Sequence, residues 1–187
     1  NIECGNITLV EFIGERVFNV RGLILAAKEW GALGSKPVIA LHGWLDNAAS
    51  FDLLLPSLED THVLAIDSAG HGQSAFRSSD AGYELWQEIP EVIEIADQMG
   101  WADFALIGHS RGAVIAGLIA GTFPKRINGL VMIDAHMPVP ALVHNSAKQM
   151  AKSIRDDKRF ATASPSSFNS FEDAVEARAK GFLSLDR

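Results

Sequence analysis

A serine between two glycines, in the run Gly108-His109-Ser110-Arg111-Gly112, has the residue types and spacing of a nucleophile. The apolar run 104–107 before it predicts a short buried strand, and the apolar run 113–122 after it predicts a helix. A strand that turns directly into a helix must bend sharply at Ser110, which pushes the hydroxyl outward. The amide of Arg111 would then stand free at the start of the helix, where it can donate a hydrogen bond to a developing oxyanion.

A second motif, His42-Gly43-Trp44, follows the apolar run 38–41. It would lie at the carboxyl edge of the sheet, where ligands bind in open α/β folds, and Ser110 is expected on the same edge. Acyl transfer needs two donors for its oxyanion, and the amide of Trp44 is the natural second donor beside Arg111. The alternative interpretation of this motif is a turn that only ends the strand.

The run from Asp67 to Ser74 follows the apolar run 63–66 and contains Gly70, His71 and Gly72. We interpret it as a tight loop, shaped by Asp67 and the glycines, that supports the site. On this interpretation His71 has no catalytic role. His109, beside the nucleophile, is expected to pack beneath its turn.

The order of the apolar runs predicts an α/β fold. Residues 7–13 and 17–27, separated by 14–16, alternate partly between apolar and polar and predict a pair of strands. Four continuously apolar runs predict strands covered on both faces, at 38–41, 63–66, 104–107 and 130–133. Helices are expected between them, at 50–58, in a longer segment ending at Met99, and at 111–122. Strands that alternate with helices predict a mostly parallel sheet of about six strands with flanking helices.

The longer helical segment contains Pro90, which is either its first residue or a kink within it, and Gly100 is placed to end it. After Asp134 the character of the sequence changes. Amphipathic helices are expected at 146–158 and 171–182, with Ser170 and Asp173 at the spacing of a helix cap and a loop at 162–169 between them. We therefore expect a core over residues 1–135 and a second, helical part over 136–187.

Composition limits the possible partners. A net charge of −7 and the lack of a cluster of Lys and Arg argue against nucleic acid. No stretch approaches the roughly 20 apolar residues of a membrane helix. Cys4 is the single cysteine, so neither an internal disulfide nor a thiolate metal site is expected; this fits a reducing compartment such as the cytoplasm. Neither a metal nor a cofactor is implied. The first residue, Asn1, suggests either processing or a start within a longer gene product.

Taken together and in this order, the motifs resemble the α/β-hydrolase fold superfamily, most closely its serine hydrolase-like branch, which is also similar to haloalkane dehalogenases and epoxide hydrolases. The resemblance runs from Val17-Phe18-Asn19-Val20-Arg21-Gly22-Leu23, through His42 to Asn47 and Gly108 to Gly112, into Ala174 to Arg178. The dehalogenases and epoxide hydrolases carry an aspartate as nucleophile. The serine at position 110 therefore implies esterase-like acyl chemistry, with Trp44 and Arg111 as oxyanion donors.

The resemblance also implies a catalytic acid and a catalytic histidine, which follow the serine in that order in the family. This chain does not present both of them at the family's positions. The family's histidine follows the last of eight strands, whereas six are expected here, so the last two strands and the catalytic-histidine loop are missing. Asp134, at the end of the run 130–133, is a possible acid or a loop-shaping residue. His136 is a possible base, as is His144, although both fall where the helical cap is expected to begin. The candidates for substrate binding are His42, Gly43, Leu45 and Met137. An apolar acyl pocket could be lined by Trp44, Leu45, Phe51 and Met137, and core packing is the alternative interpretation of these four.

The run 130–133 would form an exposed edge strand, because nothing that could pair with it follows. We expect that the natural protein continues past Arg187, that a second chain completes the sheet, or that these residues are the ordered part of a longer protein. The favoured function is a serine hydrolase of carboxylic esters or related acyl substrates that needs a histidine from beyond this chain. Two alternatives stay open: a catalytically incomplete binding or interaction module, and a cofactor-free haloperoxidase or C–C bond hydrolase.

Overall fold

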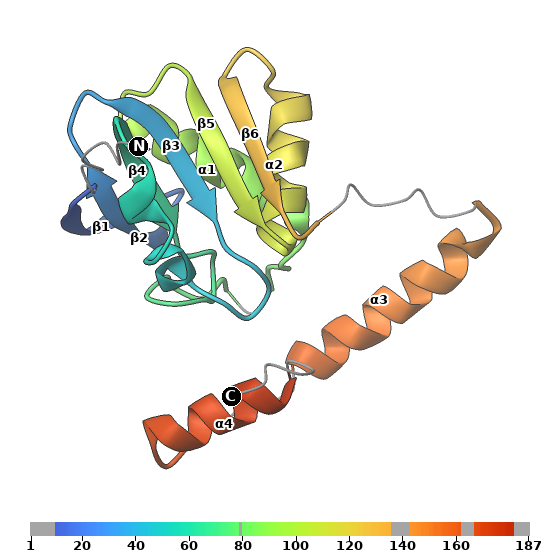
Figure 1. The fold of residues 1–187 in the computed structure, drawn as a ribbon. Coiled ribbons are helices and arrows are strands. Elements are labelled where there is room, and N and C mark those ends of the chain that lie inside the picture. Colours follow the sequence, from blue (N-terminus) through green and yellow to red (C-terminus); the bar gives the residue numbers. More distant parts are fainter. Residues whose placement is uncertain (1–9, 79, 136–142, 162–166, 182–187) are drawn as a thin grey trace, which may run out of the picture. The chain divides into compact units, whose positions relative to one another are not determined.

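The structure is a computed structural model that describes residues 10–78, 80–135, 143–161 and 167–181. The chain divides into two compact units, Asn1–Pro140 and Ala141–Arg187. The first unit holds the sheet together with the helices packed on it, and the second holds helices (Figure 1).

The first unit is built on one sheet of six strands in the order β1-β2-β4-β3-β5-β6 (Figure 1). Parallel pairing joins β4 to β3, β3 to β5 and β5 to β6, while β2 pairs antiparallel with both β1 and β4. This confirms the predicted α/β fold with a mostly parallel sheet. Because β3, β4, β5 and β6 run in the same direction, the segments that follow them all start at one edge. The strands are β1 (Phe12–Val20), β2 (Leu23–Gly31), β3 (Lys36–Leu41), β4 (Thr61–Ile66), β5 (Phe104–His109) and β6 (Ile127–Ile133).

The first two strands form a hairpin whose turn differs from the prediction. The turn lies at Arg21 and Gly22, which have φ values of 54° and 86°, and not at residues 14–16. The side chain of Asn19 stabilises it by accepting a hydrogen bond from the amide of Gly22, at 2.9 Å. Gly14 lies inside β1, beside a shift in its register with β2. The strand pair was therefore predicted correctly but its boundaries were wrong.

Two helices, α1 (Leu85–Gln98) and α2 (Arg111–Thr122), lie together on one face of the sheet (Figure 1). Pro90 lies within α1, which answers the question left open by the sequence. The helix ends where expected, because Gly100 has a φ of 71° and the next amide, of Trp101, bonds back to Ala96 at 2.9 Å. The core between these helices and the sheet is made mostly of buried aliphatic side chains, among them Ile39, Leu64, Ile95, Leu106, Ile115 and Ile119.

The opposite face of the sheet is covered by short 3-10 segments. The helix predicted at 50–58 is replaced by η1 (Ala48–Phe51) and η2 (Leu55–Ser57). Pro56 lies inside this region and has no amide to continue a helical ladder, which limits a longer helix. Phe51 and Leu55 are buried and pack against Val38, Val63 and Ile107 of the sheet.

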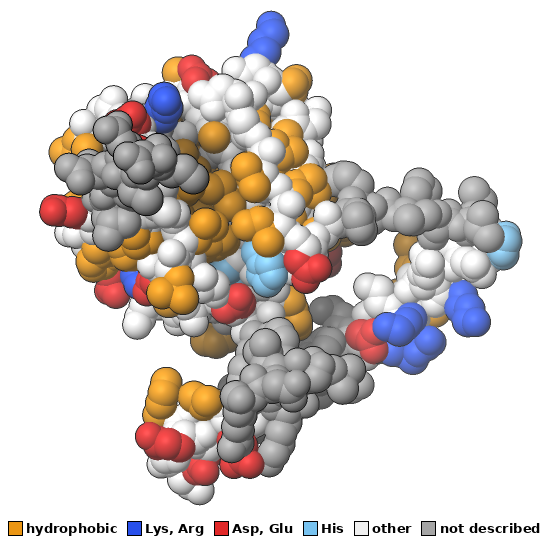
Figure 2. All heavy atoms as spheres, in the orientation of Figure 1, with side chains coloured by type: hydrophobic (Ala, Val, Ile, Leu, Met, Phe, Trp, Pro, Cys, Tyr) orange, Lys and Arg blue, Asp and Glu red, His pale blue; other side chains and the backbone are white. Residues whose placement is uncertain are grey.

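The outermost strand, β6, is more exposed than its apolar sequence predicted. Leu130 is 41% exposed, Val131 52% and Ile133 36%, so it is not a strand covered on both faces. Within the described residues β6 pairs only with β5. It therefore presents the open edge that the sequence also predicted, and Figure 2 shows apolar side chains gathered on the visible face of the first unit.

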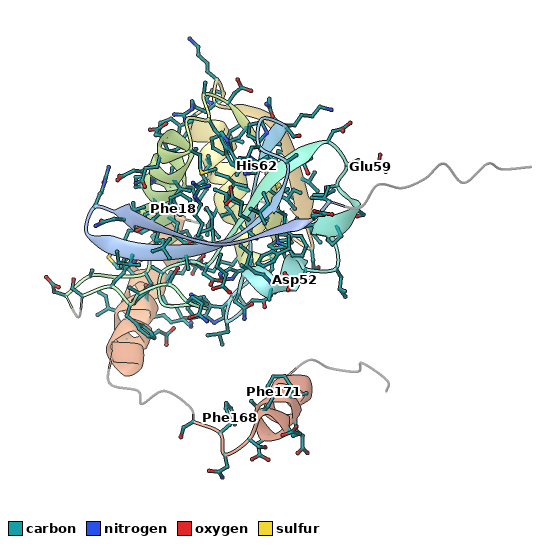
Figure 3. The ribbon with its side chains drawn as sticks, turned by 90° about the vertical axis from the view of Figure 1, so that its left-hand side faces the viewer. Phe18, Asp52, Glu59, His62, Phe168 and Phe171 are labelled. Carbon is teal, nitrogen blue, oxygen red and sulfur yellow. The ribbon has the colours of Figure 1, made fainter. Side chains whose placement is uncertain are left out.

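The second unit contains η3 (Val143–Asn145), α3 (Ser146–Ala161) and α4 (Phe171–Gly181). The hydroxyl of Ser170 accepts a hydrogen bond from the amide of Asp173 at 3.1 Å, which confirms the predicted cap. Figure 3 shows Phe168 and Phe171 beside the start of α4, where both are exposed, in contrast to the buried Phe18 of β1. Among the described helices of both units, none combines the length and apolar character needed to cross a membrane.

Candidate active site

Ser110 stands at the predicted sharp turn between β5 and α2. It caps the helix with a φ of 50° and a ψ of −113°, a conformation that L residues seldom adopt and that costs about 1–3 kcal/mol. The surrounding backbone holds it there. The amide of Ser110 donates to the carbonyl of Ile133 at the end of β6, at 2.9 Å, and its carbonyl accepts from the amide of Ala113 at 3.0 Å.

The two glycines of the motif permit the close approach of three backbone segments. A Cβ on Gly108 would lie 2.5 Å from the carbonyl oxygen of Gly112 and would also overlap the backbone of Ala113. A Cβ on Gly112 would overlap the carbonyl of Leu41, at the end of β3. Glycine is therefore required at both positions because any side chain would push α2 away from the sheet.

Gly43 brings the His42-Gly43-Trp44 loop beside Ser110. A Cβ on Gly43 would lie 3.6 Å from the Cβ of Ser110 and 3.0 Å from Nδ1 of His109. His109 therefore packs against this loop. Trp44 and Leu45 follow as exposed residues, 50% and 60% exposed, and Leu45 has a φ of 54°.

The imidazole of His42 lies beneath the loop and fixes its backbone. Its Nε2 accepts a hydrogen bond from the amide of Ser68 at 3.0 Å, so the ring proton must be on Nδ1, which donates to the carbonyl of Gly43 at 2.7 Å. Burial lowers the pKa of His42, and the nearby His71 adds to this, whereas the bond to Gly43 acts in the opposite direction. The neutral ring is thus the form that this geometry needs.

The same contacts correct the expectation that His42 contacts substrate. Its side chain is fully buried and both ring nitrogens are engaged, so it supports the loop from below. His42 influences the exposed part of the loop through one peptide group, the one that joins Gly43 to Trp44. In a trans peptide the C=O and N–H point in opposite directions, so holding the carbonyl of Gly43 also sets the direction of the amide of Trp44.

Asp67, at the end of β4, shapes the loop that follows it, as predicted. Its carboxylate accepts from the amide of Gln73 at 2.8 Å and from the amide of Ala48 at 2.7 Å. Gly72 has a φ of 51° and approaches this carboxylate so closely that a Cβ would overlap it. Asp67 thereby joins its own loop to the segment that follows Trp44.

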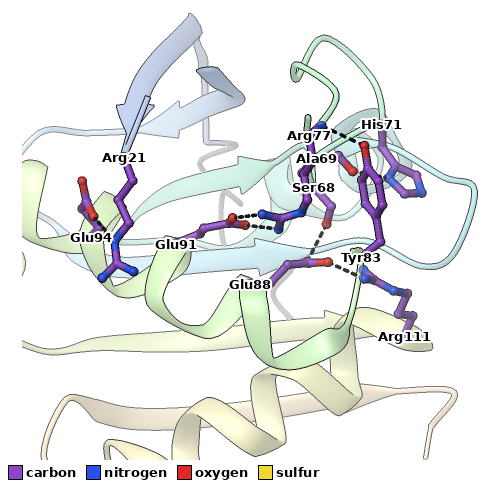
Figure 4. Close-up of polar contacts among 10 residues, drawn as sticks. All are labelled: Arg21, Ser68, Ala69, His71, Arg77, Tyr83, Glu88, Glu91, Glu94 and Arg111. Atoms are coloured by element: carbon purple, nitrogen blue, oxygen red, sulfur yellow. Dashed lines mark hydrogen bonds and ion pairs between the residues drawn. The ribbon is translucent and has the colours of Figure 1, made fainter. Parts of the chain in front are cut away.

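The sequence analysis missed a buried polar network beneath these loops, drawn in Figure 4. Glu88 of α1 accepts from the hydroxyl of Ser68 at 2.9 Å and forms an ion pair with Nη2 of Arg111. The guanidinium carbon of Arg111 lies 5.6 Å from the centre of the Trp44 ring. A signal was present, because Glu88 interrupts the apolar face of α1 between Leu85 and Val92, and a carboxylate on a buried face needs a partner.

The other residues predicted for the site are not among those of the network drawn in Figure 4. Asp134 follows β6, is exposed and has a φ of 52°. His144 is exposed and belongs to the second unit. His136 and Met137 lie outside the described residues. Across the described ranges, no group of three or more His, Cys, Asp and Glu residues could hold a metal ion.

Comparison with known proteins agrees with this architecture. The model of the alpha/beta hydrolase fold family matches residues 36–183. The human serine hydrolase-like protein is 41% identical over 111 residues, which make up 59% of this chain and 55% of that protein. The serine hydrolase-like protein of Danio rerio is 32% identical over 137 residues, or 73% of this chain and 42% of that one. The chain thus spans about half the length of these curated relatives.

A solved structure gives the same result in three dimensions. The crystal structure of a hypothetical protein from Pseudomonas aeruginosa PAO1 matches with a TM-score of 0.85 and 38% sequence identity, over 90% of this chain and 60% of that chain. The family match covers the strand before His42, the turn at Ser110 and both helices that support it. The chain therefore belongs to the alpha/beta hydrolase fold family, in its serine hydrolase-like branch.

Proposed function

We propose that the complete protein is a serine hydrolase that acts on carboxylic esters or related acyl substrates. The observation that carries the proposal is the strained turn at Ser110, with Gly43 and the amide of Trp44 beside it at the same edge of the sheet. The amide of Arg111 is the first of α2 and has no acceptor within the helix. A nucleophile flanked by two such donors has the arrangement needed for acyl transfer.

In the proposed reaction the Ser110 oxygen attacks the acyl carbon and forms a C–O bond. The hydroxyl proton passes to a histidine supplied by a part of the protein outside the described residues, and the carbonyl oxygen becomes an oxyanion that accepts from Trp44 and Arg111. The ester C–O bond then breaks, and the histidine returns the proton to the leaving alcohol. Water, deprotonated by the same histidine, hydrolyses the acyl-serine and restores the enzyme.

Asp134 is our candidate for the acid that orients this histidine. The residue before it, Ile133, accepts the hydrogen bond from the amide of Ser110, so Asp134 begins beside the nucleophile turn. Its exposure at the end of β6 leaves it accessible to a further segment. The exposed Trp44 and Leu45 support an apolar acyl group as the substrate's acid portion.

Labelling of the full-length protein with a fluorophosphonate tests the function, because such probes react with activated serines. We expect covalent modification of Ser110 and hydrolysis of a simple aryl ester, both lost in Ser110→Ala. A full-length protein that folds but is not labelled would favour a binding or interaction module instead. Equal labelling of Ser110→Ala would place the reactive serine elsewhere.

The proposal includes a partner for β6 and a cellular location. Its exposed apolar residues support pairing of this edge with a further segment of the protein or with a second chain. The low cysteine content, Cys4 alone in these residues, fits the cytoplasm. Slow hydrogen exchange at the β6 amides that face away from β5, in the full-length protein, is expected if the edge is paired.

A further inference from the structure

We propose that Glu88 is a positioning residue that holds both oxyanion donors in place through the buried network, an inference that rests on the proposed hydrolase function. Glu88 lies in the first turn of α1 and does not reach the nucleophile itself. Each of its carboxylate oxygens takes a different partner, Ser68 on one side and Arg111 on the other (Figure 4). One carboxylate therefore links Arg111, which carries one proposed donor, to Ser68, through which the loop of the other donor is reached.

The first branch runs from Glu88 to the amide of Trp44. The Ser68 hydroxyl donates to Glu88 at 2.9 Å, and the amide of the same serine donates to Nε2 of His42 at 3.0 Å. Nδ1 of His42 in turn donates to the carbonyl of Gly43 at 2.7 Å. Each contact fixes the next group, and the last one sets the peptide that contains the Trp44 amide.

The second branch is shorter, because Arg111 supplies both a donor and an anchor. Its backbone amide is the proposed donor, while its side chain, 11% exposed, pairs with the buried carboxylate of Glu88. The guanidinium also lies over the ring of Trp44, with its central carbon 5.6 Å from the ring centre. Both branches therefore end at Trp44, the first at its backbone amide and the second at its ring.

A second ion pair, between Glu91 of α1 and Arg77 of the segment before α1, shows that a buried carboxylate on this helix does not by itself support these loops. Glu91, one turn further along, is also buried and forms two contacts with Arg77, at 2.6 and 2.9 Å. Figure 4 shows Glu91 near Glu88 on α1, with Arg77 reaching it from the segment before the helix. Arg77 continues to Tyr83, whose ring and hydroxyl it contacts, and neither residue carries an oxyanion donor. Glu91 is thus a matched control.

The test compares Glu88→Gln with Glu91→Gln in the full-length protein by the kinetics of fluorophosphonate labelling. Loss of the charge on Glu88 loosens the positions of both donors, so we expect the maximal labelling rate to fall about tenfold or more while the apparent binding constant of the probe changes by less than about threefold. Glu91→Gln, which loses a comparable ion pair, should keep its labelling rate within about threefold. Thermal unfolding of both variants measures the loss of stability.

Equal labelling of Glu88→Gln and the wild-type protein would overturn the proposal, as would equal slowing by both variants. If the wild-type protein itself is not labelled, the proposed function fails first, and the two failures are thereby distinguished. Should Glu88→Gln not fold, Ser68→Ala replaces it, since this change removes the hydroxyl link to Glu88 and keeps the amide that bonds His42. Slower labelling by Ser68→Ala at unchanged probe binding supports the proposal, and an unchanged rate contradicts it.

Discussion

His42 and His62 are both buried, and they mark opposite edges of one sheet. His42 follows the carboxyl end of β3, whereas His62 is the second residue of the neighbouring parallel strand β4. His42 bonds only to backbone groups, the amide of Ser68 and the carbonyl of Gly43. His62 instead pairs with the carboxylate of Glu29 at 2.7 Å and packs edge-on against Trp101.

The comparison shows that a histidine–carboxylate pair is not by itself a catalytic feature. Glu29 also accepts from Arg16 at 2.8 Å, so three strands, β1, β2 and β4, are joined by polar side chains at the amino edge of β4. At the carboxyl edge, His42 holds the loop next to Ser110 through its hydrogen bonds to backbone groups. The two histidines therefore differ by their place along the parallel strands. His42, after the carboxyl end of β3, supports the loop beside Ser110, whereas His62, near the amino end of β4, joins neighbouring strands.

The largest difference in stability between the two edges is expected when the glycines at the two ends of α2 are replaced by alanine. Gly112→Ala, at the carboxyl edge, would place a Cβ against the carbonyl of Leu41, where backbone cannot yield easily. We expect a loss of about 3 kcal/mol or more in the free energy of unfolding, or failure to fold. Gly121→Ala, at the other end, meets nothing within 4 Å and should be neutral or stabilise by up to about 1 kcal/mol. Chemical denaturation of both variants would contradict this if their losses were equal.

Replacement of His42 should affect chemistry as well as stability. In His42→Ala the carbonyl of Gly43 and the amide of Ser68 lose their buried partner, so the amide of Trp44 is no longer fixed. We expect fluorophosphonate labelling to slow by about 100-fold, the effect of losing one oxyanion donor. Labelling kinetics of the full-length variant check this, and a rate near that of the wild-type protein would remove His42 from the proposed support.

Replacement of His62 should mainly affect stability. His62→Ala leaves the buried Glu29 paired with Arg16 and opens space beside Trp101. The free energy of unfolding is expected to fall by about 1–3 kcal/mol. The labelling rate of the folded variant should stay within about twofold of the wild-type rate. If His62→Ala lost most of its labelling without losing stability, His62 would support the site at Ser110 and the proposed difference between the two edges would be wrong.

The pH dependence of stability sharpens the contrast further. Because burial lowers the pKa of His42 below its ordinary 6.5, the unfolded chain binds this proton more readily than the folded one. The contribution of His42 to the free energy of unfolding is therefore present above pH 6.5 and is lost as the pH falls toward the folded pKa. One proton changes this free energy by at most about 1.4 kcal/mol per pH unit.

Denaturation at several pH values measures this effect as the difference between the wild-type protein and His42→Ala. The comparison of variants is needed because Glu91 titrates with the opposite sign. Burial raises its pKa, although Arg77 acts against this, so protonation of Glu91 stabilises the fold as the pH falls through its folded pKa toward 4.5. His62→Ala should keep the part of the slope that His42 contributes, and a slope unchanged in His42→Ala would contradict the assignment.

Apolar runs and short motifs were enough to predict the centre of the fold. The four runs around residues 38–41, 63–66, 104–107 and 130–133 became β3 to β6, because short continuous apolar runs that end at a turn favour strands. The helix after Ser110 was predicted with its observed bounds, since glycines mark the strand-to-helix turn. The hairpin turn was misplaced because Arg21 adopts a left-handed φ that its residue type seldom takes.

The side-chain contacts beneath the candidate site were harder to predict than the turn at Ser110. The link from Glu88 to Ser68 and Arg111 joins residues 20 and 23 positions apart in the sequence, and no local pattern encodes which of them will meet. The choice depends on how α1 crosses the sheet. The same holds for His42, whose type suggested contact with substrate but whose burial follows from the position of the loop at residue 68.

The conformation of Ser110 has a consequence for how this sequence can change. A residue held at a φ of 50° and a ψ of −113° stores free energy that the packing of β5, β6 and α2 must supply. Glycine would relieve that strain, yet it would remove the hydroxyl. Selection for stability alone would therefore favour glycine at this position. A serine here lowers the stability of the fold but keeps the hydroxyl.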